Sequence, residues 1–100
     1  MAFVQIIEYQ TSKPEEIRAL GEEYQASREA EDGTRPVHLL AVKDRDRENV
    51  YMTIVRFESY EAAMENSQRE DTNELAGKIA ALCDGPGTFR NLDVLMEWPG

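Results

Sequence analysis

The chain has 100 residues, 41% of them hydrophobic, and a formal net charge of −9 from 20 acidic and 11 basic residues. This length suits a single core, so we expect one domain over residues 1–100. The acidic balance argues against binding to nucleic acid or to an anionic membrane surface, because both require a basic patch.

The apolar runs of the chain are short. The longest, near Val37 to Val42, is interrupted by His38 and falls far below the ~18 residues that a membrane span needs. The first five residues lack the basic region of a signal peptide and lead directly into strand-like alternation. We therefore expect a cytoplasmic protein without a membrane partner.

The first half of the chain predicts a strand, a helix and a second strand. Residues 3–10 alternate, which places Phe3, Gln5, Ile7 and Tyr9 on one face and Val4, Ile6 and Glu8 on the other. Residues 12–15 (Ser-Lys-Pro-Glu) have the sequence of a capping box, and the helix that follows is expected to run to about Ala30. Asp32-Gly33 is expected to stop it, and residues 36–43 predict the second strand.

The second half begins with a fully charged hairpin loop at residues 44–49 and a β-branched, aromatic-rich strand at residues 50–57. This strand passes directly into Ser59, an expected N-cap of a helix that ends near Gln68. Residues 71–74 (Asp-Thr-Asn-Glu) predict the cap of a further helical segment ending at Cys83. After a terminator at residues 84–87, Phe89 to Trp98 predict the last strand.

The resulting order is β-α-β-β-α-β with the second helix split in two. This order predicts an α+β, ferredoxin-like split βαβ domain, in which helices cover one face of a four-stranded antiparallel sheet. Both faces of the strands carry apolar side chains, so the uncovered face would be a large apolar patch. We expect the chain to cover this face by forming a homodimer in which two sheets pack together.

The strand-to-helix corner at residues 56–63 (Arg-Phe-Glu-Ser-Tyr-Glu-Ala-Ala) resembles that of the dimeric α+β barrel superfamily, and within it the antibiotic-biosynthesis-monooxygenase-like domains. The resemblance implies a dimeric α+β barrel. Members include cofactor-independent oxygenases of polycyclic aromatics, haem-degrading enzymes and quinol oxygenases, and we expect no cofactor here. Many members place a histidine seven residues after the cap, where this chain has Asn66. The haem-degrading Asn/Trp/His constellation does not carry over, because the only tryptophan is Trp98.

His38, the only histidine, is the candidate catalytic acid or base. Histidine is the side chain whose unperturbed pKa lies near neutral pH. No neighbouring residue completes a dyad with it. The alternative is a strand histidine that is hydrogen-bonded in the dimer interface or at a sheet edge.

Asn66 and Ser67 follow small residues on the second predicted helix. Above such small side chains, the Asn66 amide is a candidate catalytic group that hydrogen-bonds a substrate carbonyl or a developing enolate. Ser67 is a candidate substrate-binding residue in the same pocket. The alternative for both is an ordinary polar helix end.

Tyr51 and Arg56 are further candidate substrate-binding residues, because polar tips within strands need partners when buried. Tyr51, like Tyr9, would hydrogen-bond an aromatic substrate, and Arg56 would hold a carboxylate or phenolate. The alternatives are an interface tyrosine and an arginine paired across strands with Glu8 or Glu58.

A metal site is not expected, because one histidine, one cysteine and outward-facing acids do not make three convergent ligands. Cys83 is expected to be a small, buried apolar side chain.

The sequence thus leaves two functions open: a cofactor-independent monooxygenase acting on a small aromatic or quinonoid compound, or a non-catalytic small-ligand-binding or accessory homodimer. A cavity of roughly 300 Å³ or more with convergent polar groups would favour the first, and a filled core the second.

Overall fold

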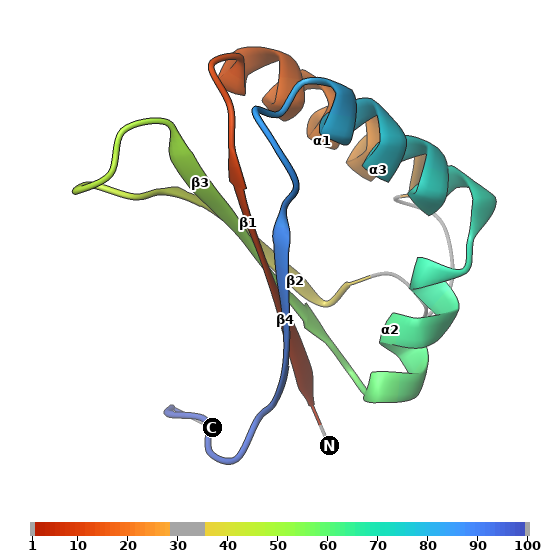
Figure 1. Ribbon diagram of the computed structural model, residues 1–100. Coiled ribbons are helices and arrows are strands. Elements are labelled where there is room, and N and C mark those ends of the chain that lie inside the picture. Colours follow the sequence, from red (N-terminus) through yellow and green to blue (C-terminus); the bar gives the residue numbers. More distant parts are fainter. Residues whose placement is uncertain (1, 29–35, 100) are drawn as a thin grey trace.

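The computed structural model describes residues 2–28 and 36–99, which form a four-stranded antiparallel sheet with helices on one side (Figure 1). The elements are β1 (Phe3–Gln10), α1 (Pro14–Arg28), β2 (His38–Lys43), β3 (Val50–Phe57), α2 (Tyr60–Ser67), α3 (Glu70–Ala81) and β4 (Thr88–Asp93). The predicted ferredoxin-like order with a split second helix is confirmed. The predicted end of the first helix near Ala30 and its stop at Asp32-Gly33 lie outside the described residues.

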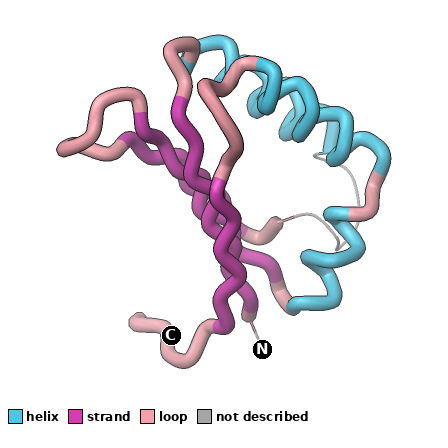
Figure 2. The backbone as a smooth tube through the Cα atoms, viewed as in Figure 1, coloured by secondary structure: helices cyan, strands magenta, loops and turns pink. Residues whose placement is uncertain are grey.

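The sheet has the order β2-β3-β1-β4, and its register sorts the side chains into two faces. Phe3 pairs with Phe57, and Tyr9 with Tyr51, so these side chains point to the same side. The helices lie on the side to which Phe3 and Phe57 point, and the other side carries no helix among the described residues (Figure 2). We call these sides the inner face and the outer face.

The register assigns the strand residues as follows. The inner face carries Phe3, Gln5, Ile7 and Tyr9 of β1, Tyr51, Thr53, Val55 and Phe57 of β3, Leu39 and Ala41 of β2, and Phe89 and Asn91 of β4. The outer face carries Val4, Ile6 and Glu8 of β1, Met52, Ile54 and Arg56 of β3, His38, Leu40 and Val42 of β2, and Arg90 and Leu92 of β4. The faces predicted for the first strand are confirmed.

The packed core lies at one end of the inner face, where Phe3, Val55 and Phe57 meet Ala63 of α2. The corner after β3 brings α2 there. The Ser59 hydroxyl accepts a hydrogen bond from the Ala62 amide at 3.0 Å, as predicted for an N-cap.

Thr11, which follows β1, is completely buried and links three segments of the chain. Its hydroxyl donates to the Leu82 carbonyl, at 2.6 Å, and accepts from the Lys13 amide at 2.9 Å. Its own amide donates to the Asn49 carbonyl in the hairpin loop, at 3.0 Å. The capping box predicted at Ser12 is therefore wrong. The side-chain hydroxyl that accepts a hydrogen bond from a backbone amide just before α1 belongs to Thr11.

Two predicted boundaries differ from the structure. α3 begins at Glu70, before the predicted cap at residues 71–74, because the Asp71 carboxylate is already engaged by the Arg69 guanidinium and the Thr72 amide. The last strand ends at Asp93 instead of Trp98, since Asp93 pairs with Phe3, the first residue of β1. None of the described helices is long and apolar enough to span a bilayer.

The charged hairpin between β2 and β3 is exposed, as predicted, and is ordered by Asp44. The Asp44 carboxylate accepts from the backbone amides of Asp46 and Arg47, at 2.9 and 3.2 Å, and from Nε of Arg47 at 2.8 Å. These bonds, led by that from the Asp46 amide, hold the pKa of Asp44 below its usual value. Asn49 closes the turn in the left-handed region, at φ 64°, which asparagine tolerates better than most residues.

We expect Asp44→Asn to lower the melting temperature at neutral pH and to match wild type at low pH. A depressed carboxyl pKa stabilises the fold above the unfolded value of about 3.9, and this contribution is lost as pH falls through the folded pKa. Thermal unfolding between pH 7 and pH 2 measures the difference. Asp46→Asn is the matched control, because Asp46 enters the turn through its backbone. A difference between Asp44→Asn and wild type that persists unchanged to pH 2 would contradict the assignment.

Candidate functional site

At the end of the inner face that lies beneath α1 and α3, the side chains are less buried than in the packed core. Of the α1 side chains described, Ile17 is buried, and α3 has no buried residue. On the sheet below them, Ile7, Tyr9, Tyr51 and Thr53 all keep part of their surface accessible, and Phe89 at the β4 edge is 60% exposed. We call these five residues the interlayer site.

Two stacked tyrosines form the floor of the interlayer site. The rings of Tyr9 and Tyr51 lie 6.0 Å apart with an interplanar angle of 20°. Burial raises the pKa of the Tyr9 hydroxyl, an effect opposed by its hydrogen bond with Thr53 and increased by the nearby Cys83 and Tyr51. Tyr9 therefore stays a neutral phenol, able to donate a hydrogen bond, at physiological pH.

An amide pair lies on the same face as the tyrosines, with Ile7 between Gln5 and Tyr9 along β1. The Gln5 side-chain amide donates to the Asn91 side-chain oxygen at 3.0 Å, across the β1–β4 pair. Each side chain retains hydrogen-bonding capacity beyond this one bond. Aromatic faces next to neutral donors and acceptors suit a planar ligand with oxygen substituents, because they can stack on its rings and bind its edge.

Of the residues proposed from the sequence, Tyr51 and Asn66 lie on the helix side of the sheet. Asn66 is three residues beyond Ala63 on α2 and is 9% exposed, which places it next to the packed core. Ser67, the next residue, is exposed, and its hydroxyl donates to the Met64 carbonyl at 2.8 Å. Ser67 thus closes the last turn of α2, as expected for a polar helix end.

His38 and Arg56 lie on the outer face, where they pair directly across β2 and β3. His38 is exposed. Arg56 donates from Nη2 to Glu97, at 2.6 Å, so its acidic partner is neither of the expected residues Glu8 and Glu58. Its buried Nε has no hydrogen-bond partner in the described part of the chain. Within a protomer, the candidate site residues are therefore divided between two sides of the sheet, with His38 and Arg56 apart from the others.

Sequence reasoning missed Gln5, Thr53 and Phe89 as residues of the helix side. The alternation of β1 already placed Gln5 with Tyr9, and a polar residue at an inward position of a strand is a sign of a lined cavity. Thr53 and Phe89 needed the strand register, which brings Thr53 of β3 opposite Ile7 on one side and Phe89 of β4 opposite Ile7 on the other.

A shallow, open depression at the start of α3 is lined by Arg69, Glu70, Asp71 and Glu74. Cys83 is partly buried, and desolvation followed by the charge of Asp84 raises its thiol pKa, so it is a poor nucleophile. Across residues 2–28 and 36–99, no three potential metal ligands of the His, Cys, Asp and Glu types gather together.

Comparison with known proteins identifies the fold. No protein-family profile and no curated protein sequence matches the chain significantly. Solved structures do match over nearly the whole length. SnoaB, a cofactor-independent oxygenase from Streptomyces nogalater, superposes with a TM-score of 0.80 at 15% identity, covering 99% of this chain and 98% of its own.

Two further structures give the same result. Rv0793 from Mycobacterium tuberculosis has a TM-score of 0.78 at 18% identity and covers 98% of this chain and 99% of its own. A Caulobacter crescentus CB15 protein, provisionally named an antibiotic biosynthesis monooxygenase, has a TM-score of 0.80 at 12% identity. The match covers 95% of this chain and 91% of its own. Such distant similarities establish a fold and no specific activity. The chain has the ferredoxin-like α+β fold of these solved structures, which include proteins described as a cofactor-independent oxygenase and as an antibiotic biosynthesis monooxygenase.

Proposed function

We propose that this protein binds a small aromatic or quinonoid compound in the interlayer site and oxygenates it with O₂ without a cofactor. The observation that carries the proposal is the partial exposure of the stacked Tyr9 and Tyr51 rings on the helix side of the sheet. The shared fold with SnoaB, described as a cofactor-independent oxygenase, supports the reaction type.

The chemistry needs a substrate whose own anion reacts with oxygen. A CH₂ group next to an aromatic ketone loses a proton to give an enolate, and the enolate transfers electrons to O₂. Overall, CH₂ and O₂ give C=O and H₂O, so no external reductant is consumed. In this proposal Tyr51 and Tyr9 contact the rings, and the neutral Tyr9 hydroxyl donates a hydrogen bond to the enolate oxygen. Asn66 lies next to the packed core at the other end of the inner face, so it is remote from these rings.

A second candidate function is a non-catalytic, ligand-binding or accessory homodimer. The position of His38 favours it, because the only imidazole of the chain lies on the outer face and cannot reach the interlayer site of its own protomer. Within a protomer, the proposed oxygenase must then rely on the acidity of its substrate. Turnover should be unchanged in His38→Gln, which retains hydrogen bonding but not proton transfer.

In either function we propose a homodimer formed by packing of the outer faces. Leu40 and Leu92 on this face remain 47% and 42% exposed in the single chain. Exposed apolar surface of this kind is typical of an interface. A monomeric mass by size-exclusion chromatography with light scattering would contradict the dimer without bearing on ligand binding.

The test uses 1,8-dihydroxyanthrone as a probe, with binding followed by its absorbance and turnover by an oxygen electrode. Tyr51→Ala should raise the Kd by about 10-fold, since it removes both an aromatic contact and its buried area. Met52→Ala is the matched control, because Met52 is the next residue on β3 and points to the outer face.

Three outcomes separate the candidates. Tyr51-dependent binding with one O₂ consumed per quinone formed supports the oxygenase. If binding depends on Tyr51 but the probe consumes oxygen at the same rate with and without the protein, the result supports the accessory protein. Equal affinities of Tyr51→Ala, Met52→Ala and wild type would remove the interlayer site from both.

A further inference from the structure

Lys43 places a positive charge at the edge of the interlayer site. It is the last residue of β2 and pairs with Tyr51 of β3, so its side chain points to the inner face beside Tyr51. Side chains paired directly across antiparallel strands have Cβ atoms about 4.5–5.5 Å apart. Tyr9, Tyr51 and Lys43 therefore form one row across β1, β3 and β2.

The charge of Lys43 is not engaged within residues 2–28 and 36–99. Its side chain is exposed and has neither a hydrogen bond nor an ion pair with these residues. Asp44, the next residue, directs its carboxylate to Arg47 and to two backbone amides of the hairpin loop. The Lys43 ammonium is therefore free to bind an anionic group of a ligand.

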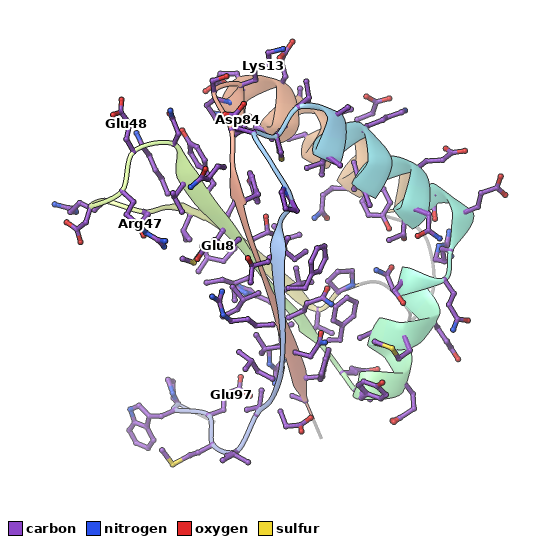
Figure 3. All side chains as sticks on the ribbon, in the orientation of Figure 1. Glu8, Lys13, Arg47, Glu48, Asp84 and Glu97 are labelled. Carbon is purple, nitrogen blue, oxygen red and sulfur yellow. The ribbon has the colours of Figure 1, made fainter. Side chains whose placement is uncertain are left out.

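The arginines of the described strands lie on the outer face and are paired with acids. Arg56 lies 2.6 Å from Glu97, and Arg90 lies 3.7 Å from Glu8. Arg47 of the hairpin loop also binds Glu8, and Figure 3 shows both on the side of the sheet away from the helices. Lys43 differs from these arginines because it lies on the inner face without an acidic partner among the described residues.

The opposite end of the row carries the opposite charge. The Asp84 amide donates to the carbonyl of Gln10, the last residue of β1, at 2.8 Å. Its carboxylate raises the pKa of the Cys83 thiol, after the larger effect of burial, and Cys83 in turn lies near Tyr9. Cys83 and Tyr9 are both neutral at physiological pH. An anionic substituent over the row is therefore attracted to the Lys43 end and repelled from the Asp84 end.

We infer that Lys43 binds the oxygen anion of an ionised phenol or enolate whose rings lie on Tyr51. The inference rests on the proposed function and names its substrate class: an aromatic phenol or ketone that ionises on binding and loses its proton to solvent. A cation beside the oxygen favours the ionised form, so ionisation occurs at lower pH than in the free compound. Lys43 thus supplies the acidity that His38 and Arg56, on the outer face, cannot supply within a protomer.

The test uses 1,2-dihydroxyanthraquinone, whose absorbance changes when a phenol group ionises. In a pH titration with excess protein, we expect the bound phenol to have a pKa about 1 unit below that of the free compound, from one nearby charge at a partly hydrated site. Lys43→Met should abolish most of this shift, and Lys43→Arg should retain it. Lys43→Glu should raise the bound phenol pKa above its value in Lys43→Met.

A second compound and a second lysine provide the controls. 1,2-Dimethoxyanthraquinone has the same rings but cannot ionise, so its Kd should be equal for Lys43→Met and wild type. The ionised dihydroxy compound should bind Lys43→Met about 10-fold more weakly, which is the same single unit expressed as affinity. Lys13→Met removes the same charge from the residue before α1 and outside the sheet (Figure 3), so it should match wild type.

The outcomes separate this inference from the proposed function. If the bound phenol has the same pKa in Lys43→Met and wild type while binding still depends on Tyr51, the role of Lys43 is overturned and the proposed function stands. Equal shifts in Lys43→Met and Lys13→Met would also overturn it, because the net charge of the protein would then explain the effect. If Tyr51→Ala binds the dihydroxy compound as tightly as wild type, the proposed function and this inference both fail.

Discussion

Replacement of Thr11 by valine is expected to lower the free energy of unfolding by about 2–4 kcal/mol. The side chain keeps its shape but loses the hydroxyl, which donates to the Leu82 carbonyl and accepts from the Lys13 amide. Both backbone groups then lose this partner next to a completely buried side chain. An orphaned buried group costs about 1–3 kcal/mol, so the two together exceed the effect of most single substitutions.

Chemical denaturation at one fixed protein concentration measures this effect and removes the influence of oligomerisation. Thr11→Ser keeps the hydroxyl and should cost about 1 kcal/mol, the contribution of one buried methyl group. Ser12→Ala, at the exposed neighbouring position, should change little. A loss for Ser12→Ala equal to that of Thr11→Val would restore the capping box at residue 12.

Phe57→Ala is expected to destabilise the fold by about 3–5 kcal/mol. Phe57 is 3% exposed and packs with Phe3, Val55 and Ala63 where α2 meets the sheet. Removal of the ring leaves a cavity in this small core. For a domain whose total stability is about 5–15 kcal/mol, such a loss leaves a substantial unfolded fraction at 37 °C.

Phe89→Ala is the control, because it removes the same side chain from the same face of the sheet at a position that is 60% exposed. We expect it to cost less than about 1 kcal/mol. Urea titrations of the two variants give the comparison. If Phe89→Ala were as destabilising as Phe57→Ala, the interlayer site would be part of the packed core and not a space for a ligand.

The strand pattern of the chain carried enough information to predict the topology. Alternation in residues 3–10 and 50–57 gave the bounds of β1 and β3 as the structure has them. Ser59 gave the start of α2, because a hydroxyl before a helix satisfies an otherwise unpaired amide whatever the tertiary context. These two local signals were therefore reliable, whereas the local caps expected at Ser12 and at residues 71–74 were not.

Boundaries that depend on a distant partner could not be predicted in the same way. The alternation of Leu92, Val94, Met96 and Trp98 continues past Asp93, but a strand also needs hydrogen-bond partners. β1 begins at Phe3, opposite Asp93, so β4 ends there. The role of Thr11 was equally hidden, because its partner Leu82 lies 71 residues away.

The sequence suggested candidate residues for the site, but it could not assign each of them to a face of the sheet. Tyr51 and Asn66 lie on the helix side as expected, whereas His38 and Arg56 lie on the outer face. Alternate residues of β2 point to opposite faces of the sheet, so the position of His38 along the strand decides its face. A shift of one residue in the pairing of β2 with β3 would move His38 to the helix side. The register comes from pairing with β3, which no local pattern around His38 reveals.

The pairing of α1 with α3 has a consequence for how the domain opens. The two helices lie side by side, and the hydroxyls of Tyr24 and Thr72 join them at 2.6 Å. Since α3 has no buried residue, the pair can separate from the sheet at a lower free energy than the sheet itself unfolds. Backbone amides of α3 should therefore exchange with deuterium well before those of β1 and β3, and a compound bound beneath the helices should slow them selectively.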